Sequence, residues 1–341
     1  MHLSYIELYQ SWLDFRRNKS SKTDVLEFES NLADNLAKLY QKINNNQYQH
    51  GHYKQFQISD PKPRLISKAS VQDRIVHHSI SRKLEKIFEK SFIFDSYSSR
   101  QNKGLHKSIV RLKKFSRKVS QNHRFTFWAL KIDIHKFFDS VDHGILLNLV
   151  RAKVPILESF GIYQQIIKSF CSNLGDGKGI PLGNLTSQIS ANIYLNQLDQ
   201  YAKQNLRIKY YLRYSDDLLI LHRSKTQLLW WLSRIENYLY DSLKLTINRP
   251  KIRIRKNTHG IDWLGYFIYP KHILPRSATR RRIYRQFNQK NHDININLKQ
   301  LRRTLVSYYG YLSHTQDTKT FARLKKIYYQ SYLLYHKYKA Q

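Results

Sequence analysis

The sequence predicts an α+β fold in which helices cover an antiparallel sheet. Segments rich in β-favouring residues alternate with helical segments between residues 125 and 268. Two of the predicted strands, residues 208–213 and 218–222, are separated by a short turn and are therefore predicted to form a hairpin. Strands and helices interleaved in this order are typical of a ferredoxin-like sheet backed by helices.

The N-terminal part is predicted to be helical, with one extended interruption. Apolar residues recur at spacings of three or four up to about residue 50, which indicates a helical lead-in. Residues 53–70 contain two prolines, so this basic segment is predicted to be extended. Ser70 is placed to cap a helix over residues 71–89, because a serine side chain accepts backbone N–H groups at this position.

Further elements alternate before the chain becomes mainly helical and strongly basic after residue 270. They are a strand ending at Asp133, a helix that Asp142 is placed to cap, a second helix from Leu185, the hairpin, a helix over 226–240 and strands over 245–248 and 261–268. We therefore predict three parts, of which the second contains an insertion over about residues 147–182. The parts are residues 1–124, 125–268 and 269–341.

The composition indicates a polyanionic partner. The 341-residue chain has 59 Lys and Arg against 24 Asp and Glu, a formal net charge of +35, and 41% of its residues are apolar. Aromatic residues make up 13% of the chain and offer faces on which bases can stack, so we expect nucleic-acid binding. No apolar run reaches about 18 residues, so we expect no membrane association. A single cysteine excludes an intrachain disulfide.

Acidic residues at the hairpin turn suggest a metal site. The turn has the sequence Tyr214-Ser-Asp-Asp, which places Asp216 beside Asp217. Asp133 ends a β-favouring run and is the candidate third carboxylate, on a strand beside this hairpin. Two hard divalent cations held about 3.5–4 Å apart need several carboxylate oxygens, as in phosphoryl-transfer enzymes. The alternative is a solvated turn, in which aspartate is common.

These residues belong to a series of motifs that resembles the reverse transcriptases. The motifs, in family order, are Asp133-x4-Phe138, Leu182-Gly-Asn-Leu-Thr-Ser-Gln188, Tyr214-Ser-Asp-Asp217, Lys251 and Trp263-Leu-Gly265. Earlier segments resemble the fingers motifs of bacterial and group II intron-type enzymes: Pro63-Arg-Leu-Ile66 with Asp73-Arg-Ile75, and Ser96-Tyr-Ser-Ser-Arg100 with Lys103-Gly104. The resemblance covers about residues 55–270.

The resemblance implies a right-hand polymerase with fingers in residues 1–124, a ferredoxin-like palm and a basic helical thumb. It implies an RNA-directed DNA polymerase that uses dNTPs, template RNA and an RNA–DNA hybrid. The catalytic residues would be Asp133, Asp216 and Asp217, holding two Mg²⁺ ions, with Ile134 as a further ligand and Mn²⁺ able to substitute.

Several residues are predicted by resemblance to contact the incoming dNTP, the primer or the duplex. The dNTP contacts are Lys62, Arg64, Arg74, Phe138, Leu182, Gly183, Gln188 and Lys251, the last of these near the pyrophosphate. The primer grip would be Trp263, Leu264 and Gly265, and the thumb contacts Arg280, Arg281 and Arg282. Several of these residues have a structural alternative: an ion pair for Arg74 with Asp73 or another neighbour, core packing for Phe138, a simple turn for Gly183 and a solvated lysine for Lys251.

The central motif departs from the common form of the family, which begins with Gln and ends with Pro. This chain has Leu182 and Gln188 at those positions. That form is similar to the reverse transcriptases of diversity-generating retroelements, which copy a template-repeat RNA into adenine-mutagenised cDNA for mutagenic retrohoming. Residues 305–314 resemble that subgroup as well. The resemblance implies a cytoplasmic enzyme of bacterial or phage origin and a small basic accessory protein that forms a helical barrel.

Two other interpretations stay open. One is another bacterial reverse transcriptase, of retron, group II intron-derived or phage-defence type. The other is an RNA-binding protein that keeps a polymerase fold without its chemistry.

Leu182 is the first residue of the central motif. An aliphatic side chain there constrains base pairing less than Gln would, so Leu182 is predicted to favour misincorporation. The alternative is that Leu182 only packs.

Overall fold

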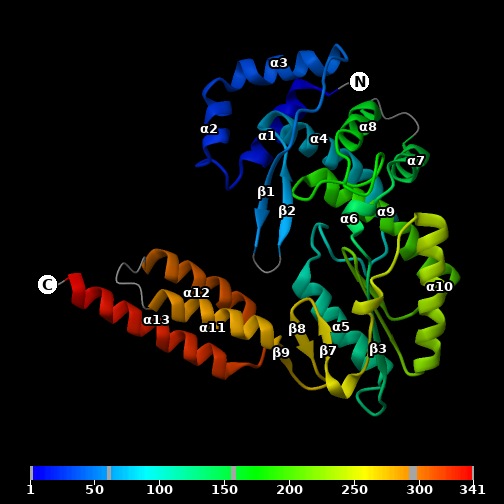
Figure 1. Ribbon diagram of the computed structural model, residues 1–341, viewed down its shortest axis with the longest axis vertical. Helices are drawn as coiled ribbons and strands as arrows, with labels where there is room; N and C mark the ends of the chain where they lie inside the picture. The colour runs from blue at the N-terminus through cyan, green and yellow to red at the C-terminus, as the bar shows by residue number, and fades with distance from the viewer. Residues whose placement is uncertain (1–2, 60–62, 155–158, 292–297, 340–341) are drawn as a thin grey trace. The chain divides into compact units, whose positions relative to one another are not determined.

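The chain folds into two units whose segments alternate along the sequence. The computed structural model describes residues 3–59, 63–154, 159–291 and 298–339 (Figure 1). The first unit comprises Met1–Lys103, Ile132–Leu218 and Leu229–Ile252, and the second comprises Gly104–Lys131, Leu219–Leu228 and Arg253–Gln341. Strands β3 (Trp128–Asp133) and β5 (Asp217–His222) therefore each have residues in both units.

Helices make up most of the N-terminal part of the first unit, as the sequence predicts. They are α1 (Tyr5–Arg16), α2 (Thr23–Ser30), α3 (Leu32–Asn44) and α4 (Val71–Phe88). α1 packs against α3 and α4 and buries one face that includes Trp12 and Phe15. Ser70 caps α4 by accepting the N–H of Asp73 at 3.1 Å, which confirms the predicted helix start.

The basic segment before α4 forms a hairpin. β1 (Lys54–Ile58) pairs antiparallel with β2 (Arg64–Lys68) (Figure 1). In this register Lys54 lies opposite Lys68. The prediction of an extended segment is confirmed. In addition, the two halves of this segment pair with each other and so satisfy each other's backbone hydrogen bonds.

A four-stranded sheet carries the candidate carboxylates. Its order is β4 (Tyr211–Tyr214), β5, β3 and β6 (Arg253–Lys256), and β3 pairs antiparallel with β6. The predicted strand over 245–248 is wrong, because this segment makes an isolated bridge between Ile247 and Ile134 instead of a ladder. The strand paired with β3 is β6, which the sequence did not predict. Its charged residues are suited to the edge of a sheet, but in the sequence they look the same as a solvated basic segment.

Helices connect the strands of this sheet in the part of the chain that the structure describes. They are α6 (Phe137–Ser140), α7 (His143–Lys153), α8 (Phe160–Lys168), α9 (Leu185–Gln200), which continues into the π-helical turn Tyr201–Asn205, and α10 (Lys225–Leu243). α9 is buried on most sides and packs against α4 and α7, as expected of a core helix. Asp142 caps α7 by accepting the N–H of Ile145 at 2.9 Å, as predicted.

The second unit contains α5 (Leu105–Val119) and a small antiparallel sheet. Its strands pair in the order β7 (Ile261–Trp263), β8 (Tyr266–Ile268) and β9 (Ile273–Pro275). The prediction of one continuous strand over 261–268 is wrong. Leu264 and Gly265 have φ angles of 47° and 94°, and such a pair of positive φ angles turns the chain into a tight hairpin.

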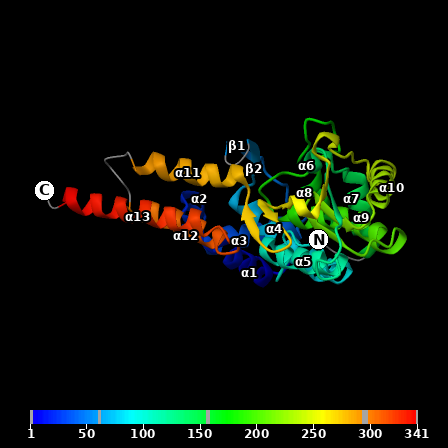
Figure 2. The same cartoon turned by 90° about the horizontal axis from the view of Figure 1, so that it is seen from below.

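Basic helices complete the second unit, as far as its residues are described. α11 (Ser277–Asn291), α12 (Leu298–Leu312) and α13 (Thr318–Lys339) pack against one another (Figure 2). Their shared core consists of Ile283, Leu301, Leu312, Leu324 and Ile327. The prediction that the chain becomes helical after residue 270 holds from Ser277 onward. No helix in the described part of the chain is long and apolar enough to cross a membrane.

Candidate active site

The hairpin turn presents two neighbouring carboxylates, as the sequence predicts. β4 ends at Tyr214, and Ser215 adopts a left-handed conformation with φ of 53°. Asp216 completes the turn and Asp217 begins β5. A left-handed residue reverses the chain within a short distance, so both side chains lie at one end of the hairpin.

Asp133 lies at the end of the strand next to this turn. β3 ends at Asp133 and is the neighbour of β5, and the N–H of Ile134 donates to the carbonyl of Asp216 at 3.4 Å. Burial, first, and then the neighbouring charges of Asp217 and Asp133 raise the pKa of Asp216 to about 6. The three acidic side chains are thus close enough to repel one another, and the site concentrates negative charge that a divalent cation would neutralise.

Lys251 provides a positive charge at this site. Its Nζ lies 2.8 Å from Oδ1 of Asp133, and the N–H of Asn248 donates to the carbonyl of Asp133 at 2.8 Å. Lys251 is therefore not simply solvated. Within the described residues no three carboxylate, histidine or cysteine side chains are arranged to hold a metal ion. The oxygen donors fit Mg²⁺ in their chemistry, and Lys251 would compete with an ion that is held through Oδ1 of Asp133.

The central motif is held against the β1–β2 hairpin. The N–H of Ser67 donates to the carbonyl of Leu182 at 3.0 Å, and the side chain of Asn184 donates to the carbonyl of Ser67 at 2.8 Å. Gly183 has a φ of 108°, and a Cβ there would lie 2.7 Å from Cγ2 of Ile66. The close approach that Gly183 permits in this structure is therefore to β2.

Arg74 is tied to structural partners. Its guanidinium pairs with Asp24 at 2.5 Å and lies over the ring of Phe15, 4.6 Å from the centroid. The ion-pair alternative is therefore observed, with Asp24 and not Asp73 as the partner. A role for Arg74 in dNTP binding stays a prediction.

The other predicted dNTP contacts differ in exposure. Arg64 and Gln188 are exposed, at the start of β2 and in the first turn of α9. Phe138 is half-buried and packs edge-on against Phe137, with centroids 5.3 Å apart. Lys62 lies outside the described residues. Exposure leaves Arg64 and Gln188 accessible to a ligand.

A comparison with protein families identifies the family of this chain. The family described as "Reverse transcriptase (RNA-dependent DNA polymerase)" matches residues 36–268, which is more than half of the chain. The chain belongs to the reverse transcriptase family. The matched region includes Asp133, the central motif and the Asp216–Asp217 turn.

Curated relatives of this reverse transcriptase include intron-encoded proteins. The "Putative COX1/OXI3 intron 2 protein" of Saccharomyces cerevisiae is 22% identical, covering 74% of this chain and 37% of that protein. "Protein YkfC" of Escherichia coli is 25% identical, covering 62% and 65%. The "Group II intron-encoded protein LtrA" of Lactococcus lactis is 21% identical, covering 65% and 46%. The matches thus span from about a third to about two thirds of each relative.

Solved structures show the same fold. Apo telomerase from Candida tropicalis superposes with a TM-score of 0.55 at 10% identity, covering 91% of this chain and 63% of that chain. Telomerase from Candida albicans in complex with a TWJ fragment of telomeric RNA gives a TM-score of 0.51 at 11% identity, covering 85% and 61%. The predicted α+β fold of a right-hand polymerase is confirmed.

The predicted primer-grip residues of this reverse transcriptase occupy the β7–β8 hairpin. Trp263 is fully buried and its indole N–H donates to the hydroxyl of Ser108 at 2.9 Å, which anchors the hairpin to α5. Leu264 and Gly265 are half-buried and form the turn, and the carbonyl of Gly265 accepts the hydroxyl of Tyr311 at 2.6 Å. The anchor and the α12 contact fix this turn from two sides.

The three consecutive arginines of α11 do not form one surface. Arg280 lies 3.9 Å from Asp317, Arg281 is exposed, and Arg282 is half-buried beside the core residue Ile283. Successive residues of a helix point about 100° apart, so the arginines spread around α11. Arg280 and Arg281 are both exposed, but the guanidinium of Arg280 faces Asp317.

Sequence reasoning missed a buried group of polar side chains behind the carboxylate turn. Arg213 and Asp199 are fully buried and form a salt bridge at 2.8 Å. Asn192 and Tyr211 bond to the same pair. The available signal was Arg213 within an otherwise apolar strand, since an arginine there needs a buried partner.

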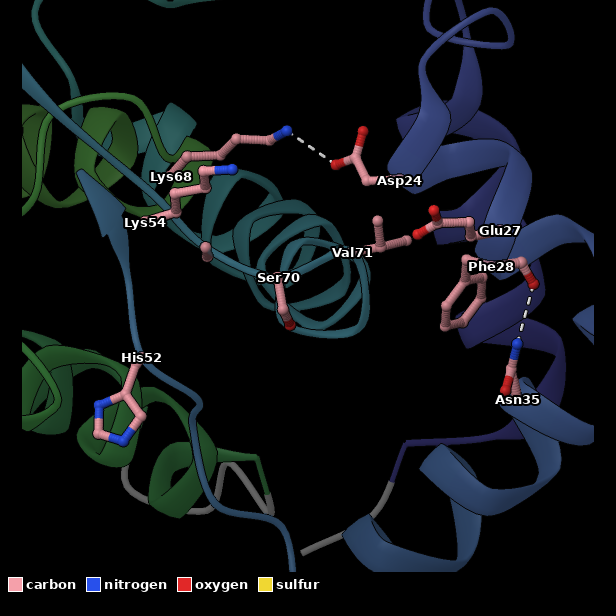
Figure 3. A pocket seen from close by; sticks show the side chains of 10 residues that line it. Asp24, Glu27, Phe28, Asn35, His52, Lys54, Lys68, Ser70 and Val71 are labelled. Carbon is pink, nitrogen blue, oxygen red and sulfur yellow. Dashed lines mark hydrogen bonds and ion pairs between the residues drawn. The ribbon is translucent and has the colours of Figure 1, made fainter. Parts of the chain in front are cut away.

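A separate cavity lies beside the N-terminal helices. It has a volume of about 540 Å³ and is lined by Asp24 and Glu27 of α2 and by Lys54 and Lys68 of the hairpin (Figure 3). Lys68 pairs with Asp24 at 2.8 Å. None of the three candidate aspartates lines this cavity. It is therefore distinct from the carboxylate site.

Proposed function

We propose that this reverse transcriptase is an active RNA-directed DNA polymerase whose catalytic residues are Asp133, Asp216 and Asp217. The observation that carries the proposal is the placement of Asp133 at the end of β3, beside the Asp216–Asp217 turn on the adjacent strand. Membership of the family supports it. Substrates would be dNTPs and a primer on template RNA.

The proposed chemistry divides between ions and side chains. Two bound Mg²⁺ ions would activate the primer 3′-hydroxyl and neutralise the triphosphate. Asp133, Asp216 and Asp217 supply the oxygens that would hold them, with the carbonyl of Ile134 as a further predicted donor. Lys251, once released from Asp133, would turn its ammonium toward the pyrophosphate. The remaining predicted dNTP contacts are Lys62, Arg64, Arg74, Phe138, Leu182, Gly183 and Gln188.

Magnesium-dependent primer extension tests this function. Asp216→Asn removes one anionic oxygen donor and should abolish extension while leaving salt-sensitive RNA binding intact. Asp139→Asn is the matched control, because Asp139 is an exposed aspartate of α6 and should extend primers like the wild type. A wild-type protein that binds RNA but extends no primer, with its cognate RNA and accessory protein present, would support the binding-only interpretation.

We further propose that the enzyme copies a template-repeat RNA in a diversity-generating retroelement. The Leu182 and Gln188 form of the central motif supports this proposal. Leu182 is half-buried, so it presents an apolar edge where Gln would offer hydrogen bonds. Leu182→Gln should lower misincorporation opposite template adenines. An unchanged error spectrum in a sequenced cDNA library would contradict this role for Leu182.

The intron-encoded relatives favour a second candidate, a group II intron-derived reverse transcriptase. The two candidates differ in their products. A retroelement enzyme should misincorporate selectively at adenines of the template, whereas an intron-derived enzyme should copy all four bases with similar error. A helical accessory protein of basic charge should stimulate extension only in the first case. Sequencing cDNA made with and without that protein separates them.

A further inference from the structure

We infer that the buried Arg213–Asp199 ion pair is the positioning element of the catalytic turn, with Arg213 acting on Asp216 through Ser215. The inference rests on the proposed polymerase function. Arg213 is the last-but-one residue of β4, so its side chain lies behind the turn that carries Asp216. It would be a positioning residue, because it contacts the turn and not the substrate.

The side chains of Arg213 and Asp199 form a buried, bidentate ion pair. Nε of Arg213 lies 2.9 Å from each carboxylate oxygen of Asp199, and Nη2 lies 2.8 Å from Oδ2. The hydroxyl of Tyr211 donates to Oδ1 of Asp199 at 2.7 Å. Both charged side chains have no exposed surface. Bidentate pairing of this kind restricts orientation as well as distance.

The third nitrogen of the guanidinium reaches the turn itself. Nη1 of Arg213 donates to the carbonyl of Ser215 at 3.2 Å and to the side-chain carbonyl of Asn192 at 3.1 Å. Ser215 is the left-handed residue immediately before Asp216. The peptide between Ser215 and Asp216 is therefore held by a donor that is itself anchored on α9.

The backbone of Arg213 is fixed as well. Its N–H donates to the carbonyl of Asp95 at 3.0 Å, and its carbonyl accepts the N–H of Tyr97 at 2.9 Å. The side chain of Asn192 also donates to the carbonyl of Ser98 at 3.0 Å. β4, α9 and the segment around residue 97 thus meet at Arg213, so little freedom is left for it to move.

Physical chemistry separates a positioning role from a stabilising one. Burying two charges costs free energy that their attraction only about offsets, and apolar pairs of similar volume often serve stability equally well. A lysine cannot replace the arginine, because one ammonium cannot hold Asp199 in bidentate fashion and donate to the Ser215 carbonyl as well. What the arginine adds is a defined orientation of the turn.

The test compares Asp199→Leu/Arg213→Met with the wild type in the full-length protein. The double variant should unfold cooperatively but at a lower temperature, because an apolar pair fills the space while Tyr211 and Asn192 lose a buried hydrogen-bond partner. The dissociation constant for Mn²⁺ alone, measured by electron paramagnetic resonance without nucleic acid, should rise about 10- to 100-fold, as when groups that orient metal ligands are removed. kcat for primer extension should fall while KM for RNA stays unchanged.

Two further variants keep the inference testable if the double variant does not fold. Arg213→Lys keeps the charge and should weaken Mn²⁺ binding about 10-fold. Tyr163→Phe is the control. It removes a buried hydrogen bond to Ser190, which lies on α9 as Asp199 does, and should lower stability without altering Mn²⁺ affinity. Unchanged Mn²⁺ affinity and kcat in a folded Arg213 variant overturn the positioning role. A wild type that extends no primer refutes the polymerase function, and the Mn²⁺ affinities then decide the positioning role alone.

Discussion

Replacing Gly183 with alanine should destabilise the protein through two separable effects. The first is backbone strain, because a φ of 108° is unfavourable for a residue with a Cβ and costs roughly 1–3 kcal/mol. The second is overpacking, because the new Cβ would lie 2.7 Å from Cγ2 of Ile66, which adds roughly 1–3 kcal/mol. The sum, about 2–6 kcal/mol, is a large part of the stability of an ordinary domain.

Two companion variants separate these effects. Gly175→Ala is matched for backbone strain, since Gly175 has a φ of 119° and no described atom lies within 4 Å of its Cβ position. Ile66→Ala removes Cγ2, so combining it with Gly183→Ala should recover about 1–3 kcal/mol relative to the sum of the single changes.

Urea unfolding of these variants measures the free energies, provided that the slopes of the transitions agree. Gly183→Ala should unfold at a lower urea concentration than Gly175→Ala. Equal costs for Gly183→Ala and Gly175→Ala, or strict additivity with Ile66→Ala, would refute the steric reasoning. The same contact joins the central motif to β2. If the effects of Gly183→Ala and Ile66→Ala simply add, the close approach to Ile66 is not the reason for a glycine at this position.

Two other predictions follow from single side chains. Burial, as the largest cause, and the charge of Lys19, as the next, lower the pKa of His78 from 6.5 to about 4. As the pH falls, His78 therefore takes up a proton in the unfolded chain before it does so in the folded protein, which favours unfolding. The melting temperature should therefore drop between pH 6.5 and 4, and His78→Phe should reduce this slope; an unchanged slope would contradict the assignment. Arg281→Ala should lower the slope of log affinity for primer–template against log salt by about one, because exposed Arg281 is predicted to neutralise one phosphate. Arg282→Ala should change the slope less, since Arg282 is half-buried.

Local signals in the sequence predicted much of the fold. Ser70 and Asp142 were identified as helix caps from position and residue type, and both make the expected backbone hydrogen bond. The turn at Asp216 was predicted because two β-favouring runs flank a short polar segment. Caps and turns depend on a few neighbouring residues, so the information needed to predict them is contiguous in the chain.

Elements that depend on distant partners were predicted less well. β6 pairs with β3, and a run of charged residues carries no sign of that pairing without its partner. The Lys251–Asp133 contact joins residues 118 positions apart in the chain. The Arg213–Asp199 pair could not be predicted without knowing that β4 packs against α9. The resemblance to reverse transcriptases supplied the role of Asp133, which spacing alone could only suggest.

The contact between Lys251 and Asp133 gives the protein a counter-ion of its own. An ammonium group within the chain balances part of the charge of three crowded carboxylates. Asp133, Asp216 and Asp217 would supply the oxygens for magnesium, and Lys251 would stay tethered nearby where the ion takes its place at Asp133. The displaced lysine would then be available at the moment when a triphosphate brings new negative charge to the same place.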